Sequence, residues 1–598
     1  MKKSLICVLL MILSSSLFGQ TTKQLPIYAG LFKIESKKNP LGAENELLGL
    51  KRTFDIQGVP YKIILNPDEL SNYATVFTAG ALMGSDVDPR LLNLLYSYVE
   101  EGGVLVSAGQ IGKRFYPLFG VSAYFPSRKR YRMHFTGSDS ALKYIDRPEE
   151  STISLGNGEQ HFYDEVIWSH GYQIEGKSKS LAVFEDKTTA FSRLQYGRGK
   201  SYLLGVTYTD TILIPQLGQD YEAQRQFVNS IEPSADVIML ILKSIYQSHT
   251  KPYIYISSIP YAKPTALILS HDVDAQTSFV DSLKYVDLEE KYGVTSTFFE
   301  TTKTFIDSMD IDYYNLEKNK TAIRQVKNRG WDIGSHTVSH SRLFAELLKG
   351  SPQESIISYR PKINKTIFGE VIISKALLDR DIPNQNTISF RAGDLAFPFG
   401  LIGVLETAGY LYDSTFSAND VLTAFPYFAF KDRRIGSEVS NIIEIPVTLD
   451  DALEFLTEET LDQAVKTWID IVEANMGNGA ITVLLVHPSD TRDSNYKLIA
   501  QEKIMKHVLK LNGWLGNLTE FGEFIRLRSQ IKLSILQDRN GDLIIKSNTK
   551  KNHPMVGFMI GNLPTKHTSI EVHNSTGTDL HYRTIGESGE LKMVFLDQ

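Results

Sequence analysis

Short apolar runs alternate with amphipathic stretches along most of this chain, the pattern of strands followed by helices in α/β proteins. In the first part, such runs predict short buried strands at residues 61–65, 74–78 and 104–107. Before the third strand, five apolar residues keep the three-four spacing of an amphipathic helix: Leu91, Leu94, Leu95, Tyr98 and Val99. Gly102 and Gly103 then supply a helix C-cap. We therefore predict an α/β domain over residues 24–255.

A second alternating region covers residues 262–526. Its predicted strands are Thr265–Ser270, Thr295–Phe299, Trp331–Ser335, Thr387–Arg391, Ile442–Pro446 and Ile481–His487. Helical stretches such as Leu461–Met476 separate these strands, and this regular alternation predicts a parallel sheet, open or closed. Residues 341–386 form a long excursion between two strands, with a helix expected near 374–379.

The pattern changes near residue 530, where apolar residues begin to alternate singly with polar ones. Ile531, Leu533 and Ile535 show this period of two, and Asp538–Gly541 supplies a turn before the next apolar run. Further short strands are predicted at residues 556–560, 569–573 and 591–595. We expect a small β-sandwich over residues 530–598.

The composition is that of a folded protein with several domains. The chain has 598 residues, of which 42% are apolar and 22% are charged. A net charge of −6 gives no electrostatic reason to expect a nucleic-acid partner. After the first residues, no stretch is long and apolar enough to predict a membrane span.

Residues 1–20 have the pattern of a secretory signal peptide. Lys2 and Lys3 precede a short apolar run, and small residues lead to Gly19. This predicts export to the periplasm or the extracellular space, with an uncleaved anchor as the alternative. Cys7 is the only cysteine and lies inside the apolar run, so the mature chain would have no disulfide, thiolate site or cysteine nucleophile.

Two carboxylates end an apolar run that begins at Ala266. Side chains along a strand alternate between faces, so Asp272 and Asp274 point to one side and His271 and Val273 to the other. Two neighbouring carboxylates repel each other unless a cation lies between them or one takes a proton.

Two histidines follow another strand-like run. His336 and His340 are four residues apart, which would place both rings on one face of a helical turn. Together with Asp274 they offer two nitrogens and one oxygen, the open ligand set of a catalytic divalent metal. In the alternative interpretation, His336 caps the following helix and His340 is a surface residue.

Over residues 262–526 these motifs resemble those of the polysaccharide deacetylases, carbohydrate esterase family 4, with their NodB homology domain. The resemblance implies that Asp272 is the catalytic base and Asp274 a metal ligand. It also implies that the two imidazoles of His336-Thr-Val-Ser-His340 bind the same metal.

Three later motifs extend the resemblance. Phe390-Arg391-Ala-Gly-Asp394 implies an arginine that orients the base and a backbone N–H of Asp394 that binds the oxyanion. Asp413 resembles the aspartate that braces this arginine. In Leu485-Val-His487, the leucine would line the acetyl pocket and His487 would be the general acid. The chain departs from the family where Val273 separates the two aspartates and where the third motif lacks the usual proline and tyrosine.

The first domain has a resemblance of its own. The stretches "YVEEGGVLVSAG" (98–109) and "YGRGKSYLLGV" (196–206) resemble class I glutamine-amidotransferase-like domains. Those enzymes use a cysteine nucleophile, which this domain lacks, so we expect a non-catalytic module for packing, binding or oligomerisation.

Together these features predict a distorted (β/α) barrel, preceded by an α/β flavodoxin-like domain and followed by a small β-sandwich. The expected function is a secreted, metal-dependent deacetylase that releases acetate from N-acetylated amino-sugar polymers, using zinc or else cobalt, nickel or manganese. The alternatives are an O-acetyl esterase, a small-amide hydrolase, or a non-catalytic carbohydrate-binding or export protein. The oligomeric state stays open.

Overall fold

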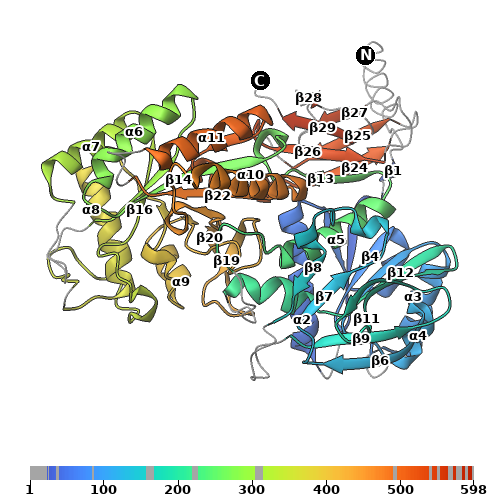
Figure 1. Ribbon diagram of the computed structural model, residues 1–598. Helices are drawn as coiled ribbons and strands as arrows, with labels where there is room; N and C mark the ends of the chain where they lie inside the picture. Colours follow the sequence, from blue (N-terminus) through green and yellow to red (C-terminus); the bar gives the residue numbers. More distant parts are fainter. Residues whose placement is uncertain are drawn as a thin grey trace, which may run out of the picture.

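A computed structural model of the chain shows a mixed α/β protein built on two large sheets and two small ones (Figure 1). It describes residues 23–24, 26–35, 39–83, 87–156, 167–218, 226–302, 314–361, 363–488, 495–537, 542–548, 553–562, 570–573, 582–585 and 590–595. The predicted signal peptide lies outside the described residues. Among the described helices, none has the length and apolar character needed to cross a membrane. The mixed α/β class predicted from the sequence is confirmed.

The first large sheet belongs to the N-terminal part of the chain. Its main order is β3-β2-β4-β5-β12-β11-β10-β7-β8, parallel from β3 to β12 and antiparallel beyond. The strands in chain order are β2 (Ala29–Lys33), β3 (Tyr61–Ile64), β4 (Thr75–Ala79), β5 (Val104–Ala108), β7 (Arg132–Phe135), β8 (Thr152–Ser154), β10 (Lys179–Phe184), β11 (Thr189–Tyr196) and β12 (Gly199–Leu204). Two further strands, β6 (Val121–Ser127) and β9 (Ser169–Ile174), pair with each other, and β9 also pairs with β11.

Local capping explains where the helices of this part begin and end. The helices are α2 (Pro40–Gln57), α3 (Pro89–Glu100), α4 (Tyr116–Phe119) and α5 (Ser234–His249). Asn39 and Asp88 accept hydrogen bonds from backbone N–H groups in the first turns of α2 and α3, and a proline follows each cap. Helix α2 ends at Gly58, whose φ of 67° suits glycine. A Cβ at Gly58 would come within 2.1 Å of the Ile256 carbonyl oxygen, so the close contact between two parts of the chain also requires glycine.

The second large sheet carries the predicted site and has the order β19-β20-β18-β17-β16-β15-β14-β22-β21, with β23 also beside β14. All its pairs are parallel except β19 with β20. Its strands are β14 (Ala266–Val273), β15 (Thr297–Glu300), β16 (Asp332–Ser335), β17 (Ser389–Phe390), β18 (Tyr412–Asp413), β19 (Tyr427–Phe430), β20 (Val439–Glu444), β21 (Leu449–Asp450), β22 (Ile481–Val486) and β23 (Trp514–Gly516). The six strands predicted from apolar runs are all present.

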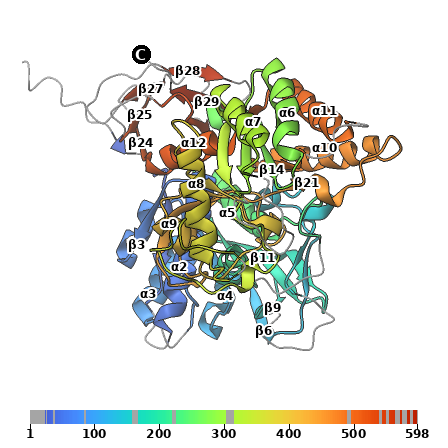
Figure 2. The same ribbon diagram turned by 90° about the vertical axis from the view of Figure 1, so that its left-hand side faces the viewer.

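Helices of this part alternate with its strands along the chain. They are α6 (Ser278–Lys291), α7 (Glu317–Asn328), α8 (Ser374–Asp381), α9 (Leu401–Thr407), α10 (Leu461–Asn478), α11 (Tyr496–Lys510) and α12 (Leu518–Gln530). Figure 2 shows α6, α7, α10 and α11 gathered on one side. Their apolar faces and the outward-facing residues of β14, β15 and β22 form one buried cluster, which includes Leu267, Phe298, Val326, Trp468 and Val508.

The two small sheets combine distant segments. One has the order β1-β24-β25-β27 and the other β13-β26-β29-β28. Their strands are β1 (Lys23–Gln24), β13 (Tyr253–Ile256), β24 (Leu533–Gln537), β25 (Leu543–Ser547), β26 (Gly557–Gly561), β27 (Ile570–His573), β28 (Tyr582–Ile585) and β29 (Glu590–Phe595). The C-terminal β structure predicted over residues 530–598 is therefore completed by β1 and β13, which come from near the two ends of the N-terminal part.

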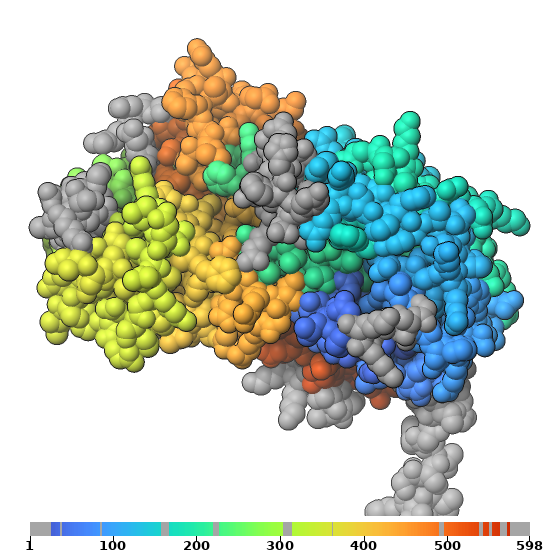
Figure 3. Space-filling model, turned by 90° about the horizontal axis from the view of Figure 1, so that it is seen from below, coloured from blue at the N-terminus to red at the C-terminus, as the bar shows by residue number. Residues whose placement is uncertain are grey.

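Arg528 on α12 joins three parts of the chain. Its buried guanidinium donates to the carbonyl oxygens of Asp55 (3.0 Å) and Ile56 (2.8 Å) at the end of α2. It also donates to those of Ser257 (2.8 Å) and Ile256 (3.2 Å) beside β13. The carbonyls at a helix end have no partner within the helix, so Arg528 supplies donors that α2 lacks. Figure 3 shows the N-terminal part of the chain, in blue and cyan, beside yellow and orange segments of the second large region.

We expect Arg528→Leu to lower the free energy of unfolding by about 3 kcal/mol, because buried carbonyl oxygens would lose a charged donor. Denaturant unfolding of the full chain measures this loss. Arg526→Leu is the matched control, since Arg526 lies on the same helix, is only half-buried, and donates to the carbonyls of Leu411 and Asn441. Equal losses in the two variants would contradict the role of Arg528 as a link between parts.

Candidate active site

The predicted catalytic residues lie where the parallel strands of the second sheet end. Asp272 is the second-last residue of β14 and Asp413 the last residue of β18, while His336, Arg391 and His487 directly follow β16, β17 and β22. The carboxyl ends of parallel strands meet at one edge of a sheet, so side chains far apart in the sequence become neighbours there.

Asp272 is buried and forms an ion pair with Arg391. Its Oδ1 lies 2.9 Å from Arg391 Nη1, and its Oδ2 lies 3.6 Å from His336 Nε2. Burial favours a higher pKa for Asp272, but electrostatic interactions with His336, Arg391 and His487 and the hydrogen bond from Arg391 outweigh burial, and the pKa is below its ordinary value. Asp272 is therefore ionised at neutral pH, as a general base must be.

Arg391 is fully buried and held from several sides. Its Nε and Nη2 donate to the carbonyl oxygen and the hydroxyl of Ser414, each at 2.9 Å. Its Nη1 also donates to Ser270 Oγ at 3.0 Å, and the guanidinium lies 4.5 Å from the centre of the Phe299 ring. This fixes the direction from which Arg391 meets Asp272.

Asp413 reaches Arg391 through neighbours rather than by a hydrogen bond of its own. Its Oδ1 accepts from Thr415 Oγ1 at 2.6 Å, and Thr415 Oγ1 accepts from the N–H of Ala392. Burial raises the pKa of Asp413 to about 6, and burial and the charge of Asp413 raise that of Glu444, so Glu444 keeps its proton. Ser414 therefore makes the direct hydrogen bonds to Arg391, and Asp413 supports the backbone beside Arg391 through Thr415.

Asp274, His336 and His340, the three expected metal ligands, lie in one region but not on a helix, and among the described residues they do not form a group whose donor atoms all lie within 4.8 Å of one another. Residues 336–340 form a loop in which Thr337 and His340 have positive φ values of 66° and 48°. The expectation of a helical turn is wrong, because left-handed residues interrupt any helix here. The loop nevertheless brings the rings of His336 and His340 to a centroid distance of 5.0 Å. His340 Nε2 lies 3.7 Å from Asp274 Oδ2.

The chemistry of this donor set, two imidazoles and one carboxylate, suits a divalent ion such as zinc. Burial lowers the pKa of His336 to about 4, so its ring is uncharged. His336 Nδ1–H donates to the Arg391 carbonyl oxygen at 2.9 Å, which leaves the Nε2 lone pair free for a ligand. The 3.7 Å between His340 Nε2 and Asp274 Oδ2 exceeds a hydrogen bond and is near the separation of about 3–3.5 Å expected for two ligand atoms on one zinc ion.

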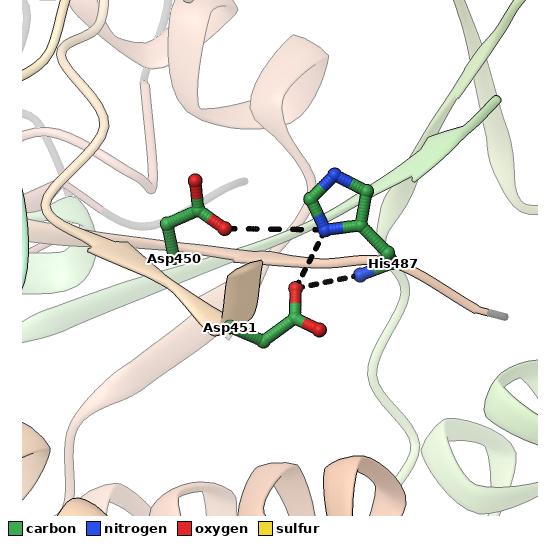
Figure 4. A group of neighbouring side chains, drawn as sticks. All are labelled: Asp450, Asp451 and His487. Carbon is green, nitrogen blue, oxygen red and sulfur yellow. Dashed lines mark hydrogen bonds and ion pairs between the residues drawn. The ribbon is translucent and has the colours of Figure 1, made fainter. Parts of the chain in front are cut away.

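His487 is hydrogen-bonded to Asp451 (Figure 4). Asp451 Oδ1 accepts from His487 Nδ1 at 2.7 Å and from the His487 backbone N–H at 2.9 Å. The other nitrogen, Nε2, lies 3.9 Å from Asp274 Oδ2. Burial lowers the pKa of His487, but the hydrogen bond and charge of Asp451 together with the charges of Asp272 and Asp274 raise it to about 10. His487 is therefore positioned and protonated as a general acid requires.

Asp450, Asp451 and His487 also form a group compact enough for a metal. Among the described residues, it is the group of three His, Cys, Asp or Glu residues whose potential ligand atoms all lie within 4.8 Å of one another. In this group, however, charged side chains of the protein already pair with one another. Lys497 Nζ lies 2.7 Å from Asp451 Oδ2, and His487 Nδ1 carries the proton that it donates to Asp451. The lysine ammonium already supplies the cation that this carboxylate needs.

The remaining predicted residues flank this centre. Leu485 is buried near the end of β22, where it pairs with Ser270 of β14 on one side and with Asp450 of β21 on the other. Asp394 is exposed and has a positive φ of 53° in the loop after Arg391. Its backbone N–H remains a prediction as the oxyanion donor.

Gly393 lies against His340, and we expect Gly393→Ala to weaken metal binding about tenfold. An added Cβ would come within 2.7 Å of His340 Cδ2 and push the ring aside. Isothermal titration with zinc measures the effect. Gly400→Ala is the control in the same segment, because its added Cβ would meet nothing nearer than 3.9 Å. Wild-type affinity in Gly393→Ala would show that His340 does not need its present position.

Sequence reasoning missed the partners of the catalytic groups. Asp450 and Asp451 had a usable signal, since they end an apolar run as Asp272 and Asp274 do. Ser414 and Ser270 had none, because a serine at a strand end is common and only the fold brings these two to Arg391.

Comparison with known proteins identifies part of the second region. The family model for polysaccharide deacetylase matches residues 271–369, a segment that contains Asp272, Asp274, His336 and His340. No curated protein sequence matches the chain.

Solved structures of low sequence identity were also found. A putative polysaccharide deacetylase from Mycobacterium smegmatis is 19% identical, with 44% of this chain and 91% of that chain covered and a TM-score of 0.33. Agd3, described as a novel carbohydrate deacetylase, is 11% identical, with 96% and 97% covered and a TM-score of 0.43. A CE4 family pseudoenzyme from Bacillus anthracis is 13% identical, with 46% and 68% covered and a TM-score of 0.27.

Proposed function

We propose that this protein is a metal-dependent deacetylase that hydrolyses N-acetyl groups on amino-sugar polymers and releases acetate. The observation that carries the proposal is that one edge of the second sheet holds both a group able to accept a proton and a group able to donate one. Asp272 is ionised beside Arg391, and His487 is protonated beside Asp451. The match of residues 271–369 to the polysaccharide deacetylase model supports the same activity.

Asp274, His336 and His340 would hold the metal. When bound, a divalent ion such as zinc supplies Lewis acidity, which polarises the acetyl carbonyl and makes water a better nucleophile. Cobalt, nickel and manganese are the alternatives. The ring of His336 is uncharged and oriented by its bond to the Arg391 carbonyl, as a ligand should be.

The protein's own residues perform the proton transfers. Asp272 accepts a proton as water attacks the acetyl carbon, and Arg391 keeps this carboxylate oriented. His487 donates a proton to the departing nitrogen, because an unprotonated amine is too basic to leave. Asp451 holds the His487 ring and stabilises its positive charge. Leu485 is proposed to line the acetyl pocket, and the Asp394 N–H to bind the oxyanion.

We further propose the finer domain interpretation and an exported location. The second region would be a distorted (β/α) barrel, the N-terminal part a flavodoxin-like, glutamine-amidotransferase-like module without catalysis, and the C-terminal part a small β-sandwich. The basic and apolar pattern of residues 1–20 supports cleavage near Gly19 and export to the periplasm or cell exterior.

Acetate release from a panel of acetylated polymers tests the proposal. The full chain is stripped of metal and refilled with zinc, cobalt, nickel or manganese. We expect release from N-acetylated amino-sugar polymers with at least one metal and none from stripped protein. Release from O-acetylated polymers alone would indicate an esterase, and release from small amides alone would indicate a different substrate class. No release at all would favour a carbohydrate-binding or export protein.

A further inference from the structure

Glu370 is a fully buried carboxylate to which the proposed reaction gives no task. It lies in a helical turn, Gly369–Ile373, within the long excursion between β16 and β17. The match to the family model ends at residue 369, one residue before it. Its two oxygens contact the loop that carries both metal-binding imidazoles.

The carboxylate collects four donors, three of them from that loop. Oε2 accepts from the backbone N–H groups of Val338 at 3.1 Å and Ser339 at 2.7 Å. Oε1 accepts from Ser339 Oγ at 3.0 Å and from Tyr359 O–H at 2.6 Å. All four groups donate, and the two oxygens of the Glu370 side chain accept from them.

The loop needs such a partner because its backbone is costly. Thr337 and His340 both have positive φ, which costs a residue with a side chain about 1–2 kcal/mol. The start of the loop is bound by residues at and just after the end of β15. His336 N–H donates to the Glu300 carbonyl at 3.0 Å, and Thr302 N–H donates to the Thr337 carbonyl at 3.1 Å. Strand contacts thus fix the first half, and Glu370 binds the segment between the two imidazoles.

Tyr359 fixes Glu370 in turn. A Cβ at Gly369 would come within 2.0 Å of the Tyr359 ring, so this ring packs directly on the backbone beside Glu370. Its hydroxyl then reaches Oε1, and the carboxylate keeps its direction toward the loop.

We propose that Glu370 is a positioning residue, which sets the placement of His336 and His340 by binding Val338 and Ser339 between them. The inference rests on the proposed function, because it assigns Glu370 to the metal site of that function. Residues behind the ligands of a metal site typically change affinity about 10–100-fold when removed.

Glu289 on α6 offers a matched control. It is as fully buried as Glu370 and also has four donors, namely His271 Nε2, Gln501 Nε2, Ser296 Oγ and Trp331 Nε1, at 2.6–2.8 Å. None of these donors belongs to the loop 336–340. Glu289→Ala therefore reports the general cost of removing a buried, four-donor carboxylate.

The test is titration of the metal-stripped full chain with Co²⁺, recording affinity, the visible absorption spectrum and the melting temperature. We expect Glu370→Ala to bind Co²⁺ about 10–100-fold more weakly and with an altered spectrum, whereas Glu289→Ala melts earlier but binds as wild type. Glu370→Gln should restore much of the affinity and spectrum, because its amide oxygen still accepts from both backbone N–H groups.

Unchanged binding in Glu370→Ala, or equal weakening in both alanine variants, would overturn the inference. Should Glu370→Ala not fold, Glu370→Gln and Glu289→Gln make the same comparison. Glu370→Gln should then bind Co²⁺ more weakly than wild type, by less than the roughly 10–100-fold expected for alanine, and Glu289→Gln should bind as wild type. A wild-type chain that binds no Co²⁺ overturns the proposed metal centre and this inference together. Wild-type binding with an unaffected Glu370 variant overturns this inference alone.

Discussion

Asp272→Asn is expected to keep its metal and to lose turnover by about 10²–10⁴-fold, the usual contribution of a general base. Asparagine has nearly the shape of aspartate. In the wild-type protein, Arg391 Nη1 donates a hydrogen bond to Asp272 Oδ1 at 2.9 Å, and the amide oxygen of asparagine can still accept it. Asparagine cannot take a proton from water. Elemental analysis of metal content beside acetate release measures both quantities.

The comparison variants each remove a proposed ligand. Asp274→Ala, His336→Ala and His340→Ala should lose metal and activity together, because only three side chains would hold the ion. The structure gives a reason to assign different roles to Asp272 and Asp274. Each lies near an imidazole, but only Asp272 forms an ion pair with Arg391. If Asp272→Asn loses its metal as readily as Asp274→Ala, the division into base and ligand is wrong.

Apolar runs predicted the second sheet well because its strands are buried on both faces. In β14, residues Ala266 to Val273 are all buried, so the strand appears as one continuous apolar run that ends at the carboxylates. The rule that links strand ends to function drew attention to Asp272, and the family resemblance added Arg391 and His487; the structure has all three at the ends of parallel strands. The same rule would have located Asp450 and Asp451, had it been applied to the run that ends at Leu449.

Features that depend on distant pairing could not be predicted in this way. Strands β1 and β13 join the C-terminal sheets because exposed strand edges there need partners, and edge pairing leaves no periodic signal. The loop 336–340 was misjudged because a spacing of four residues fits both a helical turn and an irregular loop. Glu370, which binds this loop in the structure, comes 31 residues after Ser339 and inside an excursion without a clear sequence pattern.

His487→Ala is expected to keep the metal and lose about 10²–10⁴-fold in turnover on an N-acetylated substrate. The loss should be much smaller on an activated aryl acetate, whose leaving group needs no proton. Asp451→Asn should show the same dependence on the leaving group with a smaller loss, because asparagine still has an oxygen to face His487 Nδ1 but no charge to stabilise the imidazolium.

Rates on both substrates, with metal content measured beside them, distinguish general acid catalysis from other roles of His487. Asp450→Asn is the matched control, because Asp450 Oδ1 lies 3.9 Å from His487 Nδ1, beyond a hydrogen bond, whereas Asp451 Oδ1 lies at 2.7 Å. This variant should lose less than Asp451→Asn on the amide. Equal losses on amide and aryl ester in His487→Ala would mean that His487 positions the substrate or stabilises charge, and that the proton for the leaving nitrogen comes from another group.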